Sequence, residues 1–375
     1  MKQNALTVIV PILPDKLQFL RDYLKTIRDD VANNRYVQFA KTPSTHSARW
    51  VIFEDLPEPR LYFSACYDGT FEDYLTEITS QLGPGMDPIW ACCRGYYIRS
   101  AYNPKEFADF LLPHSFQSNV FLAAFPGLSA REISDNITFR TTFDNFLDGV
   151  QNLSPVSKSA TPLSPFAAVP ESNQWSDAFF KIMGSVTDWL VGVRPGVITP
   201  NVRIPSNRYL SDIEDRINQN QMTVLSSVKK QFWPRLLLRF FLFLGWLTGK
   251  PSPTGQLSGL STIHFARWVL IDNGNTLLFD SVYDGSWESY IDDFRDHAAS
   301  GMNAIWANCI GYPKGGCGDI EYFKQLIRSH QIPAQVFYSA YPNQTVKNIE
   351  SDRALRNDLA SAFLFMSGSY DATQK

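Results

Sequence analysis

Apolar positions in the first 150 residues follow two periodicities, one typical of buried strands and one typical of amphipathic helices. Residues 5–13 form a continuous apolar run rich in β-branched side chains, which predicts a strand buried on both faces. Leucine and isoleucine recur at helical spacing over 15–30, which predicts a helix. The other predicted elements are strands at 48–55, 60–67 and 119–127, and helices at 70–82, 104–114 and 129–150.

The end of the predicted helix at 70–82 is marked by Gly83-Pro84-Gly85. Glycine and proline are the strongest helix breakers. The apolar segment that follows, DPIWACCRGYY, is interpreted as β-like.

The same pattern returns in the second half of the chain at a constant offset. Tyr67-Asp68-Gly69 recurs 216 residues later as Tyr283-Asp284-Gly285. The string HSARWV, which begins at His46, returns as HFARWV at His264, with an offset of 218 because a loop in the first half is two residues longer. One offset with one loop insertion indicates a duplicated structural unit.

Each half predicts the order β-α-β-β-α-β once additional helices are set aside, which is the ferredoxin-like pattern. We therefore expect an α+β protein in which residues 1–150 and 206–375 form two tandem ferredoxin-like units. Their sheets are expected to pack into one pseudo-dimeric α+β barrel. This architecture requires repeated residues such as Trp90 and Trp306 to lie in equivalent elements.

The connection between the units, residues 151–205, is rich in Ser and Pro at its start and is predicted to be a linker. A helical pattern follows at 175–193, and another at 208–221 leads into the second unit.

The halves differ most at the helix predicted for residues 232–247, FWPRLLLRFFLFLGWL. Its polar side chains are Arg235 and Arg239, four residues apart and so on one side of a helix. A membrane span needs about 20 residues, so this helix is too short to cross a bilayer. Three interpretations stay open: a helix buried between domains, a helix lying in a membrane surface, or the wall of a tunnel for an apolar small molecule or lipid.

Composition narrows the function classes. The chain has 375 residues, 44% of them hydrophobic, which is enough for two real cores. A net charge of −3 and a pI near 6.0 argue against nucleic acid as a partner. Five cysteines without CxxC spacing argue against a disulfide framework or a structural zinc site. The N-terminus is interpreted as a first strand, so we expect a cytoplasmic protein, or one peripheral on the inner face of the membrane.

His264 and Arg267 are the first candidate site residues. Strand alternation places them on opposite faces of one strand, so one of them faces an interior surface. The structural interpretation is a core histidine and an arginine paired with a carboxylate such as Asp284, because an unpaired buried charge is costly. The functional interpretation is that both line a cavity. Their recurrence as His46 and Arg49 favours a role in the fold.

Other candidates stand near predicted helix ends. Asp68 and Asp284 can cap the helix that follows each Tyr-Asp-Gly turn. His114 and His330 stand at helix C-termini, where a histidine suits the helix dipole. His297 has no counterpart in the first half, which makes it a better candidate ligand than a repeated histidine.

The common nucleotide, protease and esterase motifs (GxGxxG, P-loop, HExxH, GxSxG) do not occur. The tandem arrangement instead resembles the dimeric α+β barrel superfamily, which includes dye-decolorising peroxidases, chlorite dismutases and small monooxygenases. The segments EDRINQNQMT, TIHFARWVLID, YDGSWESY and IPAQVFYSAYP are also similar to bacterial proteins labelled peroxidase-like. Dye-decolorising peroxidases carry a GxxDG motif, of which Tyr283-Asp284-Gly285 keeps the last two residues.

This resemblance implies a peroxidase-like oxidoreductase that binds haem or an apolar organic substrate in the second unit. Arg267 would then contact a propionate, carboxylate or peroxide oxygen, because a planar guanidinium binds such anions in a bidentate manner. Asp284 would accept a proton, and His264 or His297 would bind the iron. The alternative is a non-catalytic protein without a cofactor, which binds a membrane or an apolar ligand through residues 232–247.

Overall fold

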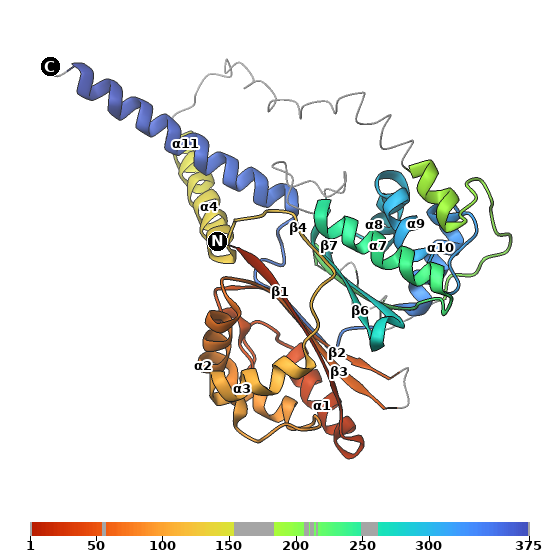
Figure 1. Cartoon of the computed structure of the whole chain (residues 1–375). Coiled ribbons are helices and arrows are strands. Elements are labelled where there is room, and N and C mark those ends of the chain that lie inside the picture. Colours follow the sequence, from red (N-terminus) through yellow and green to blue (C-terminus); the bar gives the residue numbers. More distant parts are fainter. Residues whose placement is uncertain are drawn as a thin grey trace.

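The computed structural model describes residues 2–54, 58–153, 184–205, 210, 214, 217–248 and 262–373, with the backbone alone at 150–153, 248 and 364–373. These residues form two four-stranded antiparallel sheets with helices around them (Figure 1). The predicted α+β class is confirmed.

In each sheet three strands come from one half of the chain and the fourth comes from the other half. The first sheet has the order β1 (Gln3–Pro11), β3 (Arg60–Asp68), β2 (Thr45–Phe53) and β8 (Val336–Ser339). The second has the order β4 (Val120–Ala123), β6 (Ile263–Ile271), β7 (Thr276–Asp284) and β5 (Gln219–Ser227). The structure therefore differs from two self-contained units, because the halves exchange their last strands.

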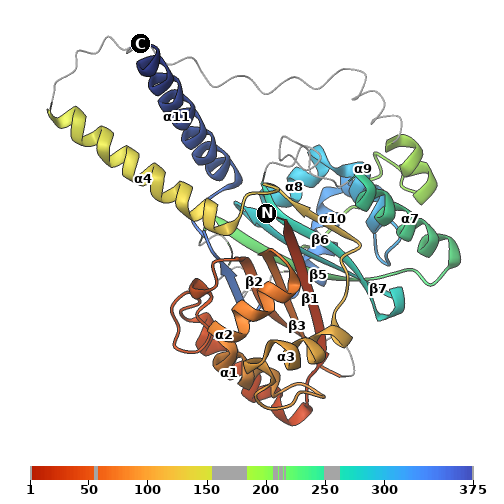
Figure 2. The same ribbon diagram turned by 60° about the vertical axis from the view of Figure 1, so that its left-hand side comes forward.

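The helices lie on the outer faces of the sheets. The first sheet is covered by α1 (Leu17–Arg28), α2 (Phe71–Trp90) and α3 (Pro104–Leu111) (Figure 2). The second is covered by α7 (Phe232–Thr248), α8 (Trp287–His297), α9 (Ala299–Trp306) and α10 (Ile320–His330). A helix over 184–191 lies beside this second group. Short 3₁₀ turns occur at Pro14–Lys16, Phe39–Lys41, Ser100–Tyr102, Leu112–His114, Asp272–Gly274 and Gly316–Gly318.

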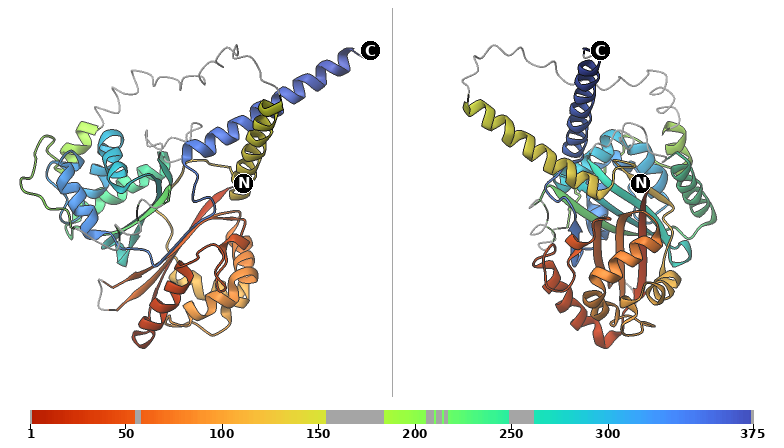
Figure 3. Two further views of the ribbon diagram at one scale, coloured as in Figure 1. Left: turned by 180° about the vertical axis from the view of Figure 1, so that it is seen from behind. Right: turned by 90° about the vertical axis from the view of Figure 1, so that its left-hand side faces the viewer.

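Two long helices project from the body, α4 (Ala130–Leu153) and α11 (Val346–Thr373), and they diverge toward their C-terminal ends (Figures 2 and 3). Near their bases they are joined by Arg140, whose Nε is 2.9 Å from an oxygen of Asp352. Arg356 donates to Asn136 at 2.9 Å. Residues 140 and 356, and residues 136 and 352, are each 216 positions apart, so both polar contacts follow the duplication.

The repeated residues occupy equivalent elements. Tyr67 lies in β3 and Tyr283 in β7, while Trp90 and Trp306 are the last residues of α2 and α9. The inner faces of the two sheets pack against each other through apolar side chains of both. These include Ile9, Val51, Phe53 and Tyr62 of the first sheet and Leu225, Val269, Ile271 and Leu278 of the second.

The predicted end of the second helix is wrong. α2 continues through Gly83-Pro84-Gly85 to Trp90, and DPIW is helical rather than β-like. The glycines serve close packing: a Cβ on Gly83 would lie 2.5 Å from the Ala101 carbonyl oxygen, and one on Gly85 would lie 1.8 Å from that of Tyr36. Tertiary packing of this helix outweighs the local cost of its prolines.

Some of the other predicted elements lie partly outside the described residues. Of the predicted linker, residues 154–183 lie outside them. Of the helix expected at 175–193, residues 184–191 are described and are helical. The helix expected at 208–221 is wrong at its end, because β5 begins at Gln219. Its earlier part lies outside the described residues, apart from positions 210, 214, 217 and 218. The boundaries of the two units stay a prediction.

Candidate functional site

Arg49 of β2 crosses from the first sheet to the second, and its side chain is 2% exposed. Its guanidinium donates to the carbonyl oxygens of Met222 and Ser281 at 3.1 and 3.0 Å. It also donates to Gln221 Oε1 at 3.1 Å and lies 3.2 Å from Asp280. All these partners belong to β5 and β7, so one side chain joins two strands of the opposite sheet.

Arg267 of β6 makes the same kind of contact in the opposite direction. It is 1% exposed and donates to the carbonyl oxygens of Leu6 and Ala65 at 2.7 and 3.2 Å. These carbonyls stand 216 residues before the two that receive Arg49. A further N–H lies 2.8 Å from Cys66 Sγ, and burial raises the pKa of that thiol, which keeps it protonated. The two arginines therefore hold the sheets together about an approximate twofold axis.

One carboxylate breaks this symmetry. Asp280 accepts hydrogen bonds from Tyr62 and from Ser64, the latter at 2.8 Å, and pairs with Arg49. The residue 216 positions earlier is Ser64, so the first half has no matching acid. Burial acts to raise the pKa of Asp280, but Arg49 and Arg267 outweigh it and hold that pKa below its usual value. Burial raises the pKa of Tyr62 far above its usual value, so this phenol stays neutral.

His264 pairs with Asp284 through Nε2, at 2.6 Å from Oδ1. The other oxygen of Asp284 accepts from the backbone N–H of Val346, the first residue of α11, at 2.8 Å. Asp284 was expected to cap the helix directly after its turn. That expectation is wrong, because Ser286 caps α8 and Asp284 instead holds the start of α11.

The first half repeats this arrangement. His46 Nε2 lies 3.0 Å from Asp68, whose other oxygen accepts from Ala130 N–H at the start of α4. Each histidine–aspartate pair thus connects a strand to the base of a projecting helix. This repetition in both halves supports a structural role.

The two histidines differ in their second ring nitrogen. His46 Nδ1 is 2.7 Å from the hydroxyl of Tyr341. Phe125 stands 216 positions before Tyr341 and packs 5.7 Å from the ring of His264. Within the described part of the chain, His264 Nδ1 consequently has no hydrogen-bond partner.

The four site residues predicted from sequence do not form one site. The prediction that strand alternation places His264 and Arg267 on opposite faces is wrong: a β-bulge between Ile263 and Phe265 interrupts the alternation, and His264 contacts Phe125 and Tyr341. Arg267 contacts backbone carbonyls of the other sheet and not Asp284. His114 and His330 do lie at helix ends, each with Nδ1 near the carbonyl four residues before it.

These residues do not fit a haem. The His264 side chain is fully buried, its Nε2 is held by Asp284, and aromatic rings pack on the remainder. His297 is exposed at the last position of α8. Over the described ranges, no three His, Cys, Asp or Glu side chains are grouped to hold a metal ion.

One surface feature, on helix α7, was only partly predicted from the sequence. Large apolar side chains of α7 are exposed at spacings of three and four residues, and form what we call the α7 face: Phe232, Trp233, Leu236, Phe240, Phe243, Trp246 and Leu247. Leu238 and Leu242 on the opposite side are 1% exposed and fix the helix to the body. In the described chain no helix is long and apolar enough to span a membrane.

Sequence reasoning missed Asp280, Tyr62 and Gln221. A signal was available for Asp280, since comparison at the 216-residue offset shows an acid where the other half has Ser64. The same comparison sets Tyr62 against Leu278 and Gln221 against Ala5, which is a weaker signal because no charge differs between the halves.

Comparison with known proteins does not assign this chain to a family. No family profile matches the chain, and no curated protein matches it. Among solved structures it is similar to a "Putative monooxygenase" from Fusobacterium nucleatum subsp. nucleatum, with 6% identity over 92% of this chain and 97% of the other and a TM-score of 0.28. A likeness of this size assigns neither a fold nor an activity to this chain.

Proposed function

We propose that the protein binds anionic membrane surfaces through the α7 face, with α7 lying in the plane of the headgroups. The observation that carries this proposal is the exposure of the five aromatic side chains of that face, which ranges from 49% for Phe240 to 69% for Phe232. An amphipathic helix with aromatic side chains on one side is typical of interfacial binding.

The size of the exposed apolar area supports the proposal. An aromatic side chain presents about 200 Å², so five half-exposed rings leave on the order of 500 Å² uncovered. The largest apolar patch on a typical monomer covers roughly 300–600 Å² and is often functional. The leucines of the α7 face add to this area.

Charge complementarity favours an anionic bilayer over a protein as the occupant. No Asp or Glu occurs between Arg216 and Ile271, whereas Lys230 and Arg239 are exposed cations on or next to α7. Of the acids on adjoining elements, Asp272 is paired with Arg60, and Asp188 accepts a hydrogen bond from Asn303. Each cation near an anionic surface contributes about 1 kcal/mol of attraction.

A second helix extends the surface. The helix at 184–191 exposes Val186, Trp189 and Leu190 at 46%, 78% and 47%. Both this helix and α7 contact α9, the former through Asp188 and Asn303. Tryptophan is enriched where membranes meet water, so Trp189 suits the rim of such a contact.

The body of the protein serves in this proposal as a rigid support. Arg49 and Arg267 hold the sheets together, and Gly245 lets α7 approach β4, where a Cβ would lie 3.0 Å from Val120. We further propose that the facing sheets are a strand-exchanged form of the dimeric α+β barrel architecture. The equivalent contacts of the two arginines support this; an experimental structure with β4 and β8 in the sheets of their own halves would contradict it.

Vesicle flotation tests the function. The protein should float with phosphatidylcholine vesicles that contain phosphatidylserine, and less with phosphatidylcholine alone. A Phe240→Ser/Phe243→Ser variant should stay at the bottom. The matched control is Tyr97→Ser/Ile98→Ser, which removes two apolar side chains away from α7 that are more exposed (81% and 75%) than Phe240 and Phe243 (49% and 55%). Failure of the parent to float, or equal loss in the control, would rule the proposal out.

A separate variant tests how much the positive charges contribute to vesicle binding. Lys230→Glu/Arg239→Glu should reduce flotation with phosphatidylserine and leave the weak flotation with phosphatidylcholine unchanged. Circular dichroism of each variant checks that it is folded.

A further inference from the structure

The loop between α2 and α3, residues 97–103, is exposed where its counterpart in the second half is covered. Pro313 and Gly315, in the loop between α9 and α10, are buried. Tyr97 and Arg99 stand 216 positions earlier and are exposed, Tyr97 by 81%. The duplication therefore shows which surface of the first half lacks a cover that the second half has.

The cover in the second half is the segment 193–199, VRPGVIT, which forms neither helix nor strand. The Arg194 N–H donates to the Lys314 carbonyl oxygen at 2.8 Å. The N–H and the hydroxyl of Thr199 donate to Asp319 Oδ2 at 2.9 and 2.5 Å. In this chain the loop is thus covered by an extended segment that contains a proline and is held mainly by backbone hydrogen bonds.

The acceptors at the equivalent positions of the first half are free to receive such a segment. The Ile98 carbonyl, the counterpart of the Lys314 carbonyl, accepts no hydrogen bond from a described residue. Asn303, which donates to the helix at 184–191 at 2.8 Å, is replaced by Asp87. Oδ1 of Asp87 accepts two bonds from its own loop, at 2.6 and 2.5 Å, and Oδ2 has no partner in the described chain. An occupant of this surface therefore has two oxygens to which it can donate.

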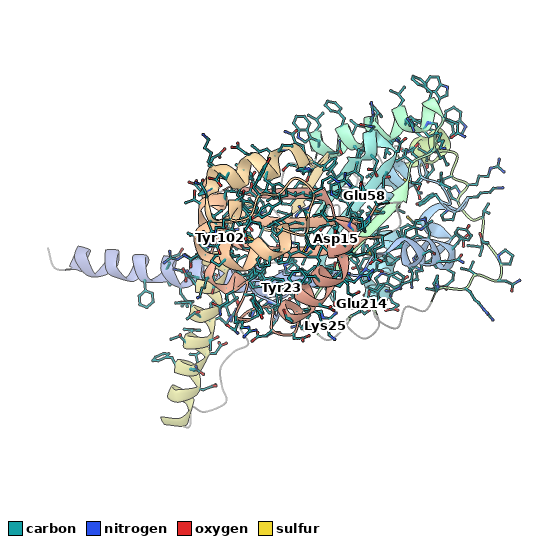
Figure 4. All side chains as sticks on the ribbon, turned by 90° about the horizontal axis from the view of Figure 1, so that it is seen from below. Asp15, Tyr23, Lys25, Glu58, Tyr102 and Glu214 are labelled. Carbon is teal, nitrogen blue, oxygen red and sulfur yellow. The ribbon has the colours of Figure 1, made fainter. Side chains whose placement is uncertain are left out.

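Aromatic rings continue from this loop onto α1. The ring of Tyr23 lies 5.9 Å from that of Phe19 and 5.0 Å from that of Tyr36. Burial raises the pKa of Tyr23 to about 12, and the nearby hydroxyls of Tyr36 and Tyr102 add to the rise. Figure 4 shows Tyr23 and Tyr102 on the same side of the molecule. We call this surface the Tyr102 face, and it consists of Phe19, Tyr23, Tyr36, Tyr97, Ile98 and Tyr102.

The exposed rings of the Tyr102 face suit proline. Phe19, Tyr97 and Tyr102 are 52%, 81% and 51% exposed. An aromatic side chain presents about 200 Å², so these three leave on the order of 350 Å² uncovered. The hydroxyls of Tyr97 and Tyr102 have no hydrogen-bond partner among the described residues. A polyproline segment matches this surface, because its rings pack on aromatic side chains and its carbonyls have no internal donors.

Charge does not select the occupant of this face. Exposed or half-exposed side chains of both signs lie on it or next to it: Arg35, Arg99 and Lys105, and Asp22, Asp87 and Glu106. An anionic membrane or a nucleic acid is attracted by cations that lack nearby acids. Recognition here consequently depends on ring packing and on hydrogen bonds to backbone.

We infer that the Tyr102 face binds an extended, proline-containing segment of a partner protein. Its proline rings pack against Tyr97 and Tyr102, and N–H groups of its other residues donate to the Ile98 carbonyl and to Asp87. The inference goes beyond the membrane proposal, because the Tyr102 face and the α7 face belong to different halves of the chain.

The partner segment does not repeat the path of residues 193–199 in full. A Cβ on Gly315 would lie 2.0 Å from the Val197 carbonyl oxygen. Arg99 stands at the equivalent position and carries a Cβ. The bound segment therefore runs beside Arg99, toward Tyr102, rather than over it.

Ligand-observed NMR titration with the peptide acetyl-(Ala-Pro)5-amide tests this inference. This peptide offers proline rings and an N–H group at every second residue. Saturable binding is expected with a Kd of roughly 1 mM or tighter. Acetyl-(Ala-Gly)5-amide lacks the rings and is more flexible, so it should bind at least about tenfold more weakly. Binding that does not saturate, or equal binding of the two peptides, would overturn the inference.

Two variants of similar exposure locate the site. Tyr102→Ala should weaken binding of the proline peptide about fivefold or more. Phe243→Ala removes a ring of the α7 face that is 55% exposed, compared with 51% for Tyr102, and should change binding less than about twofold. Both rings are half exposed, so both variants should keep the thermal transition of the parent.

Equal weakening by the two variants would contradict a site on the Tyr102 face. Self-association of the parent that Tyr102→Ala abolishes would assign the face to a second copy of the chain and would also contradict the inference. The assay contains no lipid, so its outcome is independent of the membrane proposal.

Discussion

Asp280 of one sheet lies 3.2 Å from Arg49 of the other, and this ion pair has no acidic counterpart in the first half. The pair is almost fully enclosed, with side chains 3% and 2% exposed. Two arginines that hold the sheets together thus depend on one acid. We therefore expect the junction between the sheets to be sensitive to the loss of this single charge.

The first prediction concerns that acid. Asp280→Ala leaves two buried guanidinium groups without a carboxylate, so the free energy of unfolding should fall by about 3–5 kcal/mol. Arg49→Met/Asp280→Leu removes the ion pair as a unit and should recover part of this loss. Urea unfolding of the parent and both variants measures the difference. A loss below about 1 kcal/mol for Asp280→Ala would mean that the pair does not hold the sheets together.

The second prediction is the pH dependence of the same pair. The pKa of Asp280 is lowered in the folded protein, so its stabilising contribution is present above the unfolded pKa of about 3.9. That contribution is lost as the pH falls through the folded value. The parent should lose stability below about pH 4, and Asp280→Asn should lose less over the same interval. Urea unfolding at a series of pH values measures both proteins. If their free energies of unfolding fall in parallel as the pH is lowered, Asp280 is not the cause of the acid sensitivity.

The third prediction restores symmetry around the histidines. Phe125→Tyr places a hydroxyl where Tyr341 provides one for His46, next to His264 Nδ1, which has no hydrogen-bond partner among the described residues. We expect a gain of about 0.5–1.5 kcal/mol, and a loss of similar size for Tyr341→Phe. Thermal unfolding compares the variants. Destabilisation by Phe125→Tyr would show that the ring has no space for a hydroxyl.

The fourth prediction tests the packing of α2. Gly85→Ala would place its Cβ 1.8 Å from the Tyr36 carbonyl oxygen, so it should cost about 3 kcal/mol or more. Gly149→Ala in α4 meets nothing within 4 Å and should be neutral or stabilise by up to about 1 kcal/mol. Chemical denaturation of both variants measures the contrast. Similar effects of the two changes would mean that α2 does not approach the backbone of Tyr36 so closely.

The sequence predicted the elements that depend on local pattern. The duplication, the strands and the α7 helix follow from periodicity and from one constant offset. The exchange of β4 and β8 could not be predicted, because the residues of a four-residue strand carry no information about which sheet edge they join. The continuation of α2 was missed because Gly83 and Gly85 act through a tertiary contact with the backbone of other segments.

The candidate site was predicted less well than the fold. Repetition of His264 and Arg267 as His46 and Arg49 indicated a role in the fold, and their contacts agree with that interpretation. Their partners lie on other strands and in the other sheet, so neither pairing is encoded in the spacing. The bulge at His264 also shifts the alternation that a period of two assumes.

Hydroxyl-radical footprinting of the vesicle-bound protein tests the central claim most directly. On binding to phosphatidylserine vesicles, the oxidation of Phe232, Phe243 and Trp246 should fall strongly. Tyr97 and Tyr102, which are exposed in the other half, should react as in the free protein. Unchanged oxidation of the α7 face in the bound protein, or protection of Tyr97 in its place, would contradict membrane binding through α7.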